Sequence, residues 1–183
     1  GTHPHRFTDK YKELQGDAAA VAHAQAKGRT PAGRHRPVMA AEILQALALC
    51  PGETALDATL GYGGHAEQLL PRLLPGGKLF ALDVDSVELP RTATRLRARG
   101  FGPDVLVVRA LNFASLAQLL PEAGGGFDAI LADLGVSSMQ LDNPARGFSY
   151  KAQGPLDLRL DPARGMTAAD LLQAASETLL ANL

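Results

Sequence analysis

Apolar and polar positions along the chain alternate between two spacings, which predicts helices that alternate with strands from residue 37 onward. Apolar residues recur at helical spacing in four segments, 38–47, 67–74, 90–99 and 113–120, and again from Thr167. Short apolar runs of strand length lie between them, at 54–60, 78–84, 105–110 and 127–134. This alternation predicts βαβ units, and hence a parallel sheet with right-handed crossovers.

Proline and glycine residues set the boundaries of these elements. Pro51-Gly52 should end the first helix, Pro71 should kink or end the second, and Pro90 can start the third. From 135 to 165 the regular pattern gives way to a long segment rich in Gly, Pro, Asp and Arg. A loop of this length inside a compact domain is usually functional or disordered.

The composition is that of one globular domain, with 183 residues, of which 46% are hydrophobic and 20% charged. Because 18 Lys and Arg oppose 19 Asp and Glu, nucleic-acid binding by bulk charge is disfavoured and any basic surface must be local.

The single cysteine, Cys50, excludes a disulfide framework within the chain and any zinc site with two thiolates. The five histidines lack the spacing of a metal site, so we expect none. The apolar runs are shorter than the roughly 20 residues that cross a bilayer, so we expect a soluble protein without a membrane partner.

Charge is concentrated at the start of the chain. Residues 1–36 hold seven Lys or Arg against three Asp or Glu, a balance of +4, which leaves −5 for the remainder. With few large apolar side chains, 1–36 should form a solvated, poorly ordered basic leader, and 37–183 the folded domain. A basic arm that docks on RNA and the remnant of an organellar transit peptide would have the same composition. The chain starts at Gly1 and stops at Leu183 within a helical pattern, so we expect both ends to be truncated.

Residues suited to chemistry follow the predicted strands, at the carboxyl edge where open parallel sheets bind ligands. The first strand leads through Asp57 and Thr59 into the glycine-rich stretch 61–65 at the start of a helix. Glycines there allow the backbone to approach a ligand closely, and amides at a helix start can bind an anionic group. The second strand ends at Asp83, 22 residues after Gly61, where an acid can bond the two hydroxyls of a ribose. Together these features predict a cofactor that contains a nucleoside.

Two cofactor classes fit these features. Gly61-x-Gly63-x-x-Ala66 can be read as a dinucleotide fingerprint, which keeps a nicotinamide-dependent oxidoreductase open. Asp57 suits the cationic amino group of S-adenosylmethionine, or the network around it, better than a pyrophosphate. The segment 133–142 places a carboxylate, two hydroxyls and an amide in one loop, which suits the orientation of a base or amine better than hydride transfer. The chain has no G-x-x-x-x-G-K-[ST] motif, which excludes a Walker-type nucleotidase.

Five segments together closely resemble the small-subunit ribosomal RNA N4-cytosine methyltransferases of the MraW family, namely 35–38, 57–65, 127–142, 146–149 and 154–161. The resemblance covers the chain from about His35 to the C-terminus. It departs from the family at Met139, where many bacterial members have Pro or another residue, and at Leu158 and Leu160, where Met is common. These apolar replacements suggest a divergent, organellar relative.

The resemblance implies an α/β fold, the Rossmann-like class I methyltransferase fold, with S-adenosylmethionine as cofactor. It implies N4-methylation of a cytidine in small-subunit ribosomal RNA, in the cytoplasm of a bacterium or in a eukaryotic chloroplast or mitochondrion. Carried over by position, the cofactor contacts are Gly63, Gly64, His65, Asp83, Phe113, Asp133 and Gln140. A complete member has a seven-stranded sheet with a helical insertion after strand four, so this chain would hold strands one to four and the start of the insertion.

The chemistry of an amine acceptor points to Asp133 as the candidate catalytic residue. The exocyclic amine of cytosine is a poor nucleophile, so acceptors must hold its hydrogens, turn its lone pair toward the methyl group and let a proton leave. Asp133, with Ser137 or Ser138 nearby, can do this, although Asp133 could equally be a cofactor ligand only. Methylation at a ring carbon would need a cysteine nucleophile, and Cys50, at a helix end just before Pro51, is on the wrong side of the turn at the first strand for that role.

Side chains of the long loop are candidates for RNA contacts. Arg146, Lys151, Arg159 and Arg164 could bind phosphates, and Phe148 and Tyr150 could stack on a flipped base. Phe148 could equally belong to a small core under the loop. The arginines 91, 95 and 99 lie on one helix face, which we expect to be solvated. A non-catalytic RNA-binding or assembly module therefore stays open beside the two enzyme classes.

A truncated sheet has a consequence for stability. Strand four, placed inside a complete sheet, would become an open apolar edge, which favours aggregation. We therefore expect the isolated 183 residues to fold poorly or to bind cofactor weakly, and an intact C-terminal half to restore both. Tight binding of S-adenosylmethionine by this chain alone, measured by calorimetry, would contradict that expectation.

Overall fold

The computed structural model describes residues 37–182, so the predicted basic leader 1–36 lies outside the described residues. Within them, four strands form one parallel sheet in the order β3-β2-β1-β4. The strands are β1 Thr54–Asp57, β2 Lys78–Asp83, β3 Leu106–Ala110 and β4 Ala129–Leu131. The predicted α/β fold with a parallel sheet is confirmed. Because the strand order reverses between β1 and β4, the carboxyl ends of these two strands flank the point where such sheets bind ligands.

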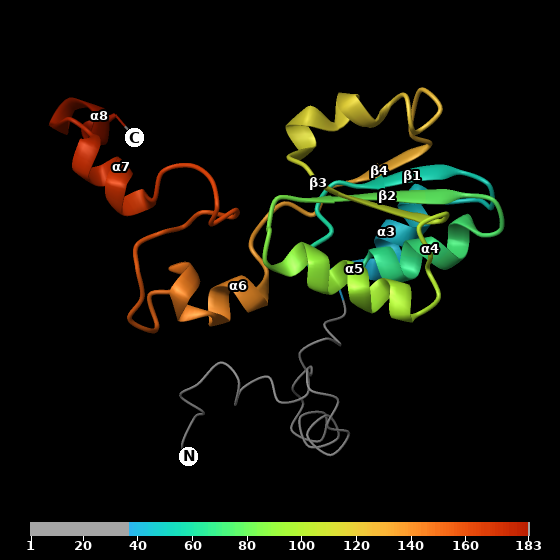
Figure 1. Ribbon diagram of the computed structural model, residues 1–183, viewed down its shortest axis with the longest axis horizontal. Coiled ribbons are helices and arrows are strands. Elements are labelled where there is room, and N and C mark those ends of the chain that lie inside the picture. Colours follow the sequence, from blue (N-terminus) through green and yellow to red (C-terminus); the bar gives the residue numbers. More distant parts are fainter. Residues whose placement is uncertain (1–36, 183) are drawn as a thin grey trace, which may run out of the picture.

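Helices cover both faces of the sheet (Figure 1). One face carries α3 Ala40–Leu47, α4 Ala66–Leu73 and α5 Glu88–Ala98, and the other carries the 3-10 helix η2 Phe113–Leu119. The chain after β4 leaves the sheet and forms α6 Ser138–Asp142, η3 Pro144–Arg146, α7 Ala168–Ala174 and α8 Glu177–Ala181. We call residues 135–182 the insertion segment.

Three boundaries differ from the sequence prediction, each for a local reason. Helix α4 runs through Pro71, which lacks an amide donor, and ends at Leu73, two residues further on, so that the proline lies in the last turn. Helix α5 begins at Glu88, which places Pro90 in the first turn, where amides need no partner within the helix. The segment 135–165 is not a continuous loop, since α6 and η3 form within it, and Thr167 caps α7 as the pattern predicts.

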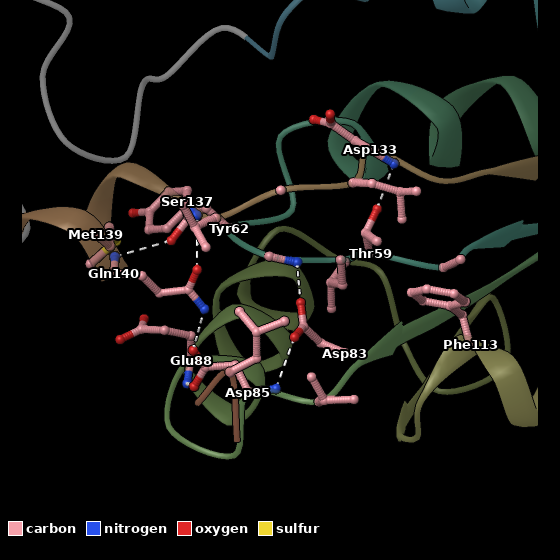
Figure 2. Close-up of a pocket in the computed structure, with 18 of the residues that line it drawn as sticks. Thr59, Tyr62, Asp83, Asp85, Glu88, Phe113, Asp133, Ser137, Met139 and Gln140 are labelled. Atoms are coloured by element: carbon pink, nitrogen blue, oxygen red, sulfur yellow. Dashed lines mark hydrogen bonds between the residues drawn. The ribbon is translucent and has the colours of Figure 1, made fainter. Parts of the chain in front are cut away.

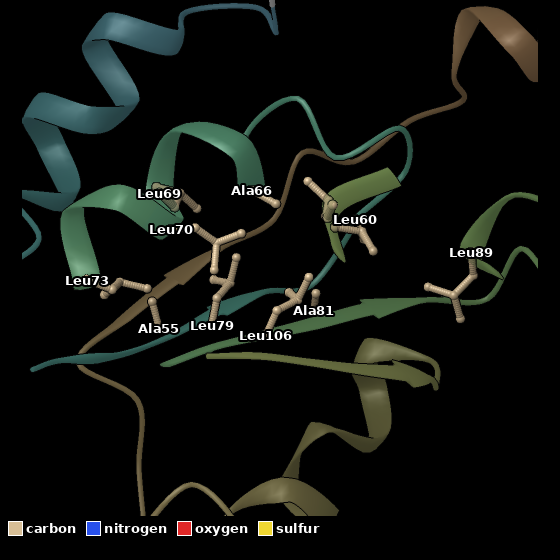
Figure 3. Packing of buried hydrophobic residues seen from close by; sticks show 11 residues of the cluster. Ala55, Leu60, Ala66, Leu69, Leu70, Leu73, Leu79, Ala81, Leu89 and Leu106 are labelled. Atoms are coloured by element: carbon tan, nitrogen blue, oxygen red, sulfur yellow. The ribbon is translucent and has the colours of Figure 1, made fainter. Parts of the chain in front are cut away.

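Alternate residues of the strands bury their side chains on opposite faces. On the face of α4 and α5, Figure 3 shows a core of aliphatic side chains from the sheet and from α4, with Ala55, Leu79, Ala81 and Leu106 facing Leu69, Leu70 and Leu73. On the face of η2, the core contains Leu56, Ala58, Phe80, Leu82 and Leu119. The strands between the two cores are therefore nearly continuous apolar runs, which is why the sequence shows them so clearly.

Strand β4 is the outer strand of the described sheet and pairs only with β1 there. Its central residue Ile130 is 50% exposed. The apolar edge expected from the sequence is therefore present in residues 37–182.

Substitution of Gly77 tests how closely the turn after α4 packs against the sheet. A Cβ atom at Gly77, which is buried, would collide with the carbonyl oxygens of Glu53 and Leu73. We expect Gly77→Ala to lower the free energy of unfolding by about 1–3 kcal/mol, the usual cost of overpacking. Gly126→Ala is the matched control, because a Cβ there meets nothing within 4 Å. Equal stability of the two variants in urea unfolding would show that the turn is not tightly packed.

Candidate cofactor and active site

A cavity of about 860 Å³ lies at the carboxyl ends of the strands and is closed on one side by the insertion segment. Figure 2 shows many of its lining side chains, which come from the segments after all four strands and from α6. Six of the seven predicted cofactor residues line it, namely Gly64, His65, Asp83, Phe113, Asp133 and Gln140. The topology thus brings together residues that are up to 76 positions apart, from Gly64 to Gln140.

Gly63 is the seventh, and it is not among the lining residues in the described part of the chain. Its N–H donates to the carbonyl of Leu60 at 2.7 Å, so this amide is already used. Its φ is +76°, and an added Cβ would lie 3.0 Å from the Thr92 methyl group. Gly63 therefore lets the glycine-rich loop pack closely on α5, and its role at the site is to shape that loop.

Asp83 fixes the glycine-rich loop to the end of β2. Its Oδ2 accepts from the N–H of Gly61 at 2.6 Å, and its Oδ1 accepts from the N–H of Asp85 at 2.9 Å. The buried Thr92 hydroxyl donates to the Gly61 carbonyl at 2.7 Å from the other side. The carboxylate is therefore oriented by backbone amides at the cavity wall (Figure 2). Thr92 was not identified from the sequence, because a threonine on an amphipathic helix carries no distinctive signal.

The predicted solvated arginine stripe is wrong for Arg95. Its guanidinium lies 3.5 Å from the centre of the Tyr62 ring and donates to the Tyr62 carbonyl. Burial raises the pKa of Tyr62 and lowers the pKa of Arg95. Arg91 and Arg99 are exposed as expected and pair with acidic residues. Since Tyr62 lines the cavity, α5 holds the loop through Arg95 as well as through Thr92.

Asp133 follows β4 and is held by its backbone. Its N–H donates to the Thr59 hydroxyl at 2.8 Å, which fixes the residue relative to the end of β1 (Figure 2). Its side chain is 58% exposed, and its Oδ2 lies 3.5 Å from Nε2 of His65, a buried residue at the start of α4. The Asp133 carboxylate is therefore anchored at the mouth of the cavity and remains accessible to a ligand.

Asp57 is the last residue of β1 and is not a lining residue of the cavity within residues 37–182. It is 1% exposed, and its Oδ1 accepts from the N–H of Thr59 at 3.1 Å, while its Oδ2 is buried without a hydrogen-bond partner in that part of the chain. Burial is the main cause that raises its pKa to about 7; the Thr59 N–H opposes this, and Asp83 and Asp133 add to it. The sequence-based interpretation of Asp57 as a direct partner of a cofactor cation is not supported by this position.

Asp57 should make stability depend on pH. With a pKa of about 7 in the folded state and 3.8 in the unfolded chain, the folded state retains a proton that the unfolded chain releases. Stability should therefore fall as pH rises from about 4 to 7, by roughly 4 kcal/mol at most. In Asp57→Asn, which cannot ionise, this loss should be absent. Urea unfolding of both proteins across this range measures it, and parallel stability curves would contradict the raised pKa.

Polar side chains at the start of α6 cap the helix. Ser137 Oγ accepts from the N–H of Gln140 at 3.2 Å, and Gln140 Oε1 accepts from the N–H of Ser137 at 2.8 Å, which is a capping box. Gln140 Nε2 also donates to Asp85 at 2.7 Å. Gln140 therefore lines the cavity with an amide whose two ends are already bonded. The hydroxyl of Ser137 caps the helix. Of Asp133 and Ser137, the two residues predicted to accept the amine hydrogens, Asp133 is therefore the more accessible.

Comparison with known proteins decides the family. The MraW methylase family matches residues 32–183. The chain belongs to the MraW methylase family. The predicted resemblance to this family is thereby confirmed, and membership of a methylase family favours the methyltransferase interpretation over the nicotinamide-dependent alternative.

Curated relatives carry the name ribosomal RNA small subunit methyltransferase H. The protein numbered 2 from Alkaliphilus metalliredigens is 55% identical over 97% of this chain and 51% of its own length. The protein numbered 1 from Lachnoclostridium phytofermentans is 50% identical over 98% of this chain and 50% of its own. The chain thus spans about half the length of these curated relatives. Among solved structures, TrmN from Thermus thermophilus is 24% identical with a TM-score of 0.44, over 66% of this chain and 36% of that chain.

The cavity of this MraW-family chain fits the nucleoside part of S-adenosylmethionine. Its volume lies within the range of cofactor pockets, about 300–1,000 Å³. The Asp83 carboxylate supplies acceptors for ribose hydroxyls, and Phe113, 43% exposed on the cavity wall, offers an apolar face for a base. The described residues include no group of three or more His, Cys, Asp or Glu side chains that could hold a metal ion.

Two of the four arginine and lysine residues expected to bind RNA phosphates in this MraW-family chain are engaged internally. Arg146 is buried at 8% exposure and pairs with Asp85 at 2.8 Å, so its predicted phosphate contact is wrong. Arg159 pairs with Asp157 at 2.7 Å. Lys151 and Arg164 are exposed.

The two predicted stacking residues lie in different surroundings. Phe148 lines the cavity, whereas Tyr150 is 95% exposed.

Among the helices between residues 37 and 182, none has the length and apolar character to cross a membrane.

Proposed function

We propose that the protein transfers a methyl group from S-adenosylmethionine to N4 of a cytidine in small-subunit ribosomal RNA. The observation that carries the proposal is Asp133, anchored through Thr59 and accessible at the mouth of the cavity that Asp83 also lines. One carboxylate is thus available for the cofactor's ribose and the other for a group that approaches from outside. The name of the curated relatives supports ribosomal RNA as the source of that group.

The proposed mechanism requires positioning more than activation. When bound, S-adenosylmethionine supplies a methyl group that is already strongly electrophilic. Asp133 accepts a hydrogen bond from the cytosine amine, which turns the nitrogen lone pair out of conjugation with the ring and toward the methyl group. After transfer, the amine nitrogen carries an extra proton, which passes to an Asp133 oxygen and from there to water. The exposed side of the Asp133 carboxylate permits that last step.

RNA binding is assigned to the insertion segment. A cytidine that leaves its stack can place its base against Phe148 on the cavity wall, while the exposed Tyr150 offers a second stacking surface. Lys151 and Arg164 are exposed on the same segment and can contact phosphates. The partner is therefore the small ribosomal subunit or its RNA. Because the relatives named above are bacterial, we place the reaction in the cytoplasm rather than in an organelle.

Mass spectrometry of small-subunit RNA tests this proposal. RNA from cells with and without the full-length protein is digested to nucleosides and compared. We expect one N4-methylated cytidine to disappear on loss of the protein and to return when the protein is supplied. Loss of a methyl group from another atom or base would contradict N4 chemistry. Unchanged methylation, combined with binding of the RNA by the protein, would favour the assembly module instead.

A further inference from the structure

Arg146 is buried between three parts of the chain that are far apart in sequence. Its Nη1 donates to Asp85 Oδ2 at 2.8 Å, and its Nη2 donates to the carbonyls of Leu160 at 2.7 Å and Arg159 at 3.3 Å. The exposed fraction is 8% for Arg146 and 1% for Asp85. One planar guanidinium therefore joins the segment after β2, the helix η3 and the segment 158–160. A lysine could not serve these acceptors together, because its ammonium is a compact point charge.

Asp85 connects this arginine to the cofactor wall. Its N–H donates to Asp83 Oδ1, and its Oδ1 accepts from the N–H of Val87, which precedes α5, and of Glu88, which begins it, at 3.0 Å each. Burial alone would raise the pKa of Asp85, but the bonds from Gln140, Arg146 and these two amides outweigh it and lower the pKa. Asp85 is therefore held as a carboxylate. A continuous chain of hydrogen bonds runs from Asp83 through Asp85 to Arg146.

Beyond Arg146, this series of hydrogen bonds reaches the apolar wall of the cavity. Phe148, Leu158 and Leu160 line the cavity, and the Arg146 guanidinium lies 5.8 Å from the centre of the Phe148 ring. Leu158 and Leu160 are 45% and 40% exposed, so little packing in residues 37–182 holds them in place. The carbonyl bonds from Arg146 fix the backbone that carries both leucines. We call Phe148, Leu158 and Leu160 the insertion wall.

We propose that Arg146 is a positioning residue that couples the insertion wall to the cofactor site. This inference rests on the proposed use of the cavity for S-adenosylmethionine. A ligand on Asp83 stabilises the end of β2, and through Asp85 and Arg146 it orders the insertion wall; by reciprocity, an ordered wall raises affinity for the ligand. A buried ion pair is weak evidence for stability but a known means of fixing one arrangement. Cofactor binding would thus prepare the surface that receives the RNA base.

Hydrogen exchange of the full-length protein, with and without S-adenosylhomocysteine, tests the coupling. In the wild type, the ligand should slow exchange of the amides at 156–161 by at least tenfold. In Arg146→Met this slowing should be lost, and ligand affinity measured by calorimetry should fall about tenfold or more. Arg146→Lys should rescue only part of both effects. Arg97→Met, which removes an exposed arginine on α5, is the control and should behave as the wild type.

The outcomes separate this inference from the proposed function. If the wild type does not bind S-adenosylhomocysteine, the proposed function fails, and the coupling fails with it. If the ligand binds and slows exchange at 156–161 equally in the wild type and in Arg146→Met, only the coupling is overturned. Asp85→Asn covers the case in which Arg146→Met does not fold, since asparagine keeps an oxygen for the α5 amides but removes the charge. Asp85→Asn should also reduce the ligand-induced slowing of exchange at 156–161, and undiminished slowing in this variant would contradict the coupling.

Discussion

Replacing Asp83 by asparagine should weaken binding of S-adenosylhomocysteine by about 10- to 100-fold, which is the value of a hydrogen bond to a charged group. Both carboxylate oxygens of Asp83 accept backbone amides, from Gly61 and Asp85. An asparagine keeps one acceptor but turns an NH₂ group toward the other amide. The variant therefore loses the negative charge that receives ribose hydroxyls and also loosens the glycine-rich loop. Isothermal calorimetry of the full-length protein measures the change in affinity.

Asp104→Asn is the matched control for this measurement. Asp104 is exposed in the turn before β3, at the opposite edge of the sheet from the cavity. It should bind the ligand as the wild type does, so a loss confined to Asp83→Asn identifies the local effect. If Asp83→Asn binds within a factor of two of the wild type, the ribose is not held at this carboxylate.

Replacing Asp133 by alanine should lower kcat for RNA methylation by about 10²–10⁴-fold, the usual contribution of a positioned acid or base. Its affinity for S-adenosylhomocysteine should change by only a few fold, because the Asp133 side chain is not the group that holds the residue in place. That group is its N–H, bonded to Thr59, which alanine keeps. Rapid-quench measurement of a single turnover with saturating cofactor and RNA separates the two effects.

This experiment also decides between the two roles that the sequence left open for Asp133. If Asp133→Ala loses cofactor affinity as strongly as it loses kcat, Asp133 is a cofactor ligand only. Asp133→Asn is a useful second variant, because an amide oxygen can still accept from the cytosine amine but cannot take up its proton. We expect it to retain more activity than alanine and less than the wild type.

The sheet and its carboxyl edge could be predicted from the sequence because their signals are local. Leu79 to Leu82 form an apolar run that belongs to a strand buried on both faces, and the glycine-rich stretch after β1 marks the turn into α4. The chain order of these elements then placed Asp83 and Asp133 at one edge without any knowledge of contacts.

Contacts between distant residues could not be predicted in this way. Arg146 has the sequence context of a surface loop, and only the fold reveals that Asp85, 61 positions earlier, lies beside it. Arg95 is spaced as part of an exposed stripe, yet Tyr62 in the glycine-rich loop reaches over to it. Asp57 was interpreted from its place at the end of a strand, whereas its burial depends on tertiary packing that the local sequence does not reveal.

A crystal structure of the full-length protein with S-adenosylhomocysteine tests the central claim most directly. We predict the nucleoside in the cavity after β1 and β2, with its ribose hydroxyls bonded to Asp83 and the sulfur atom facing the Asp133 side. A ligand bound elsewhere, or an Asp83 carboxylate directed away from the ribose, would contradict the account.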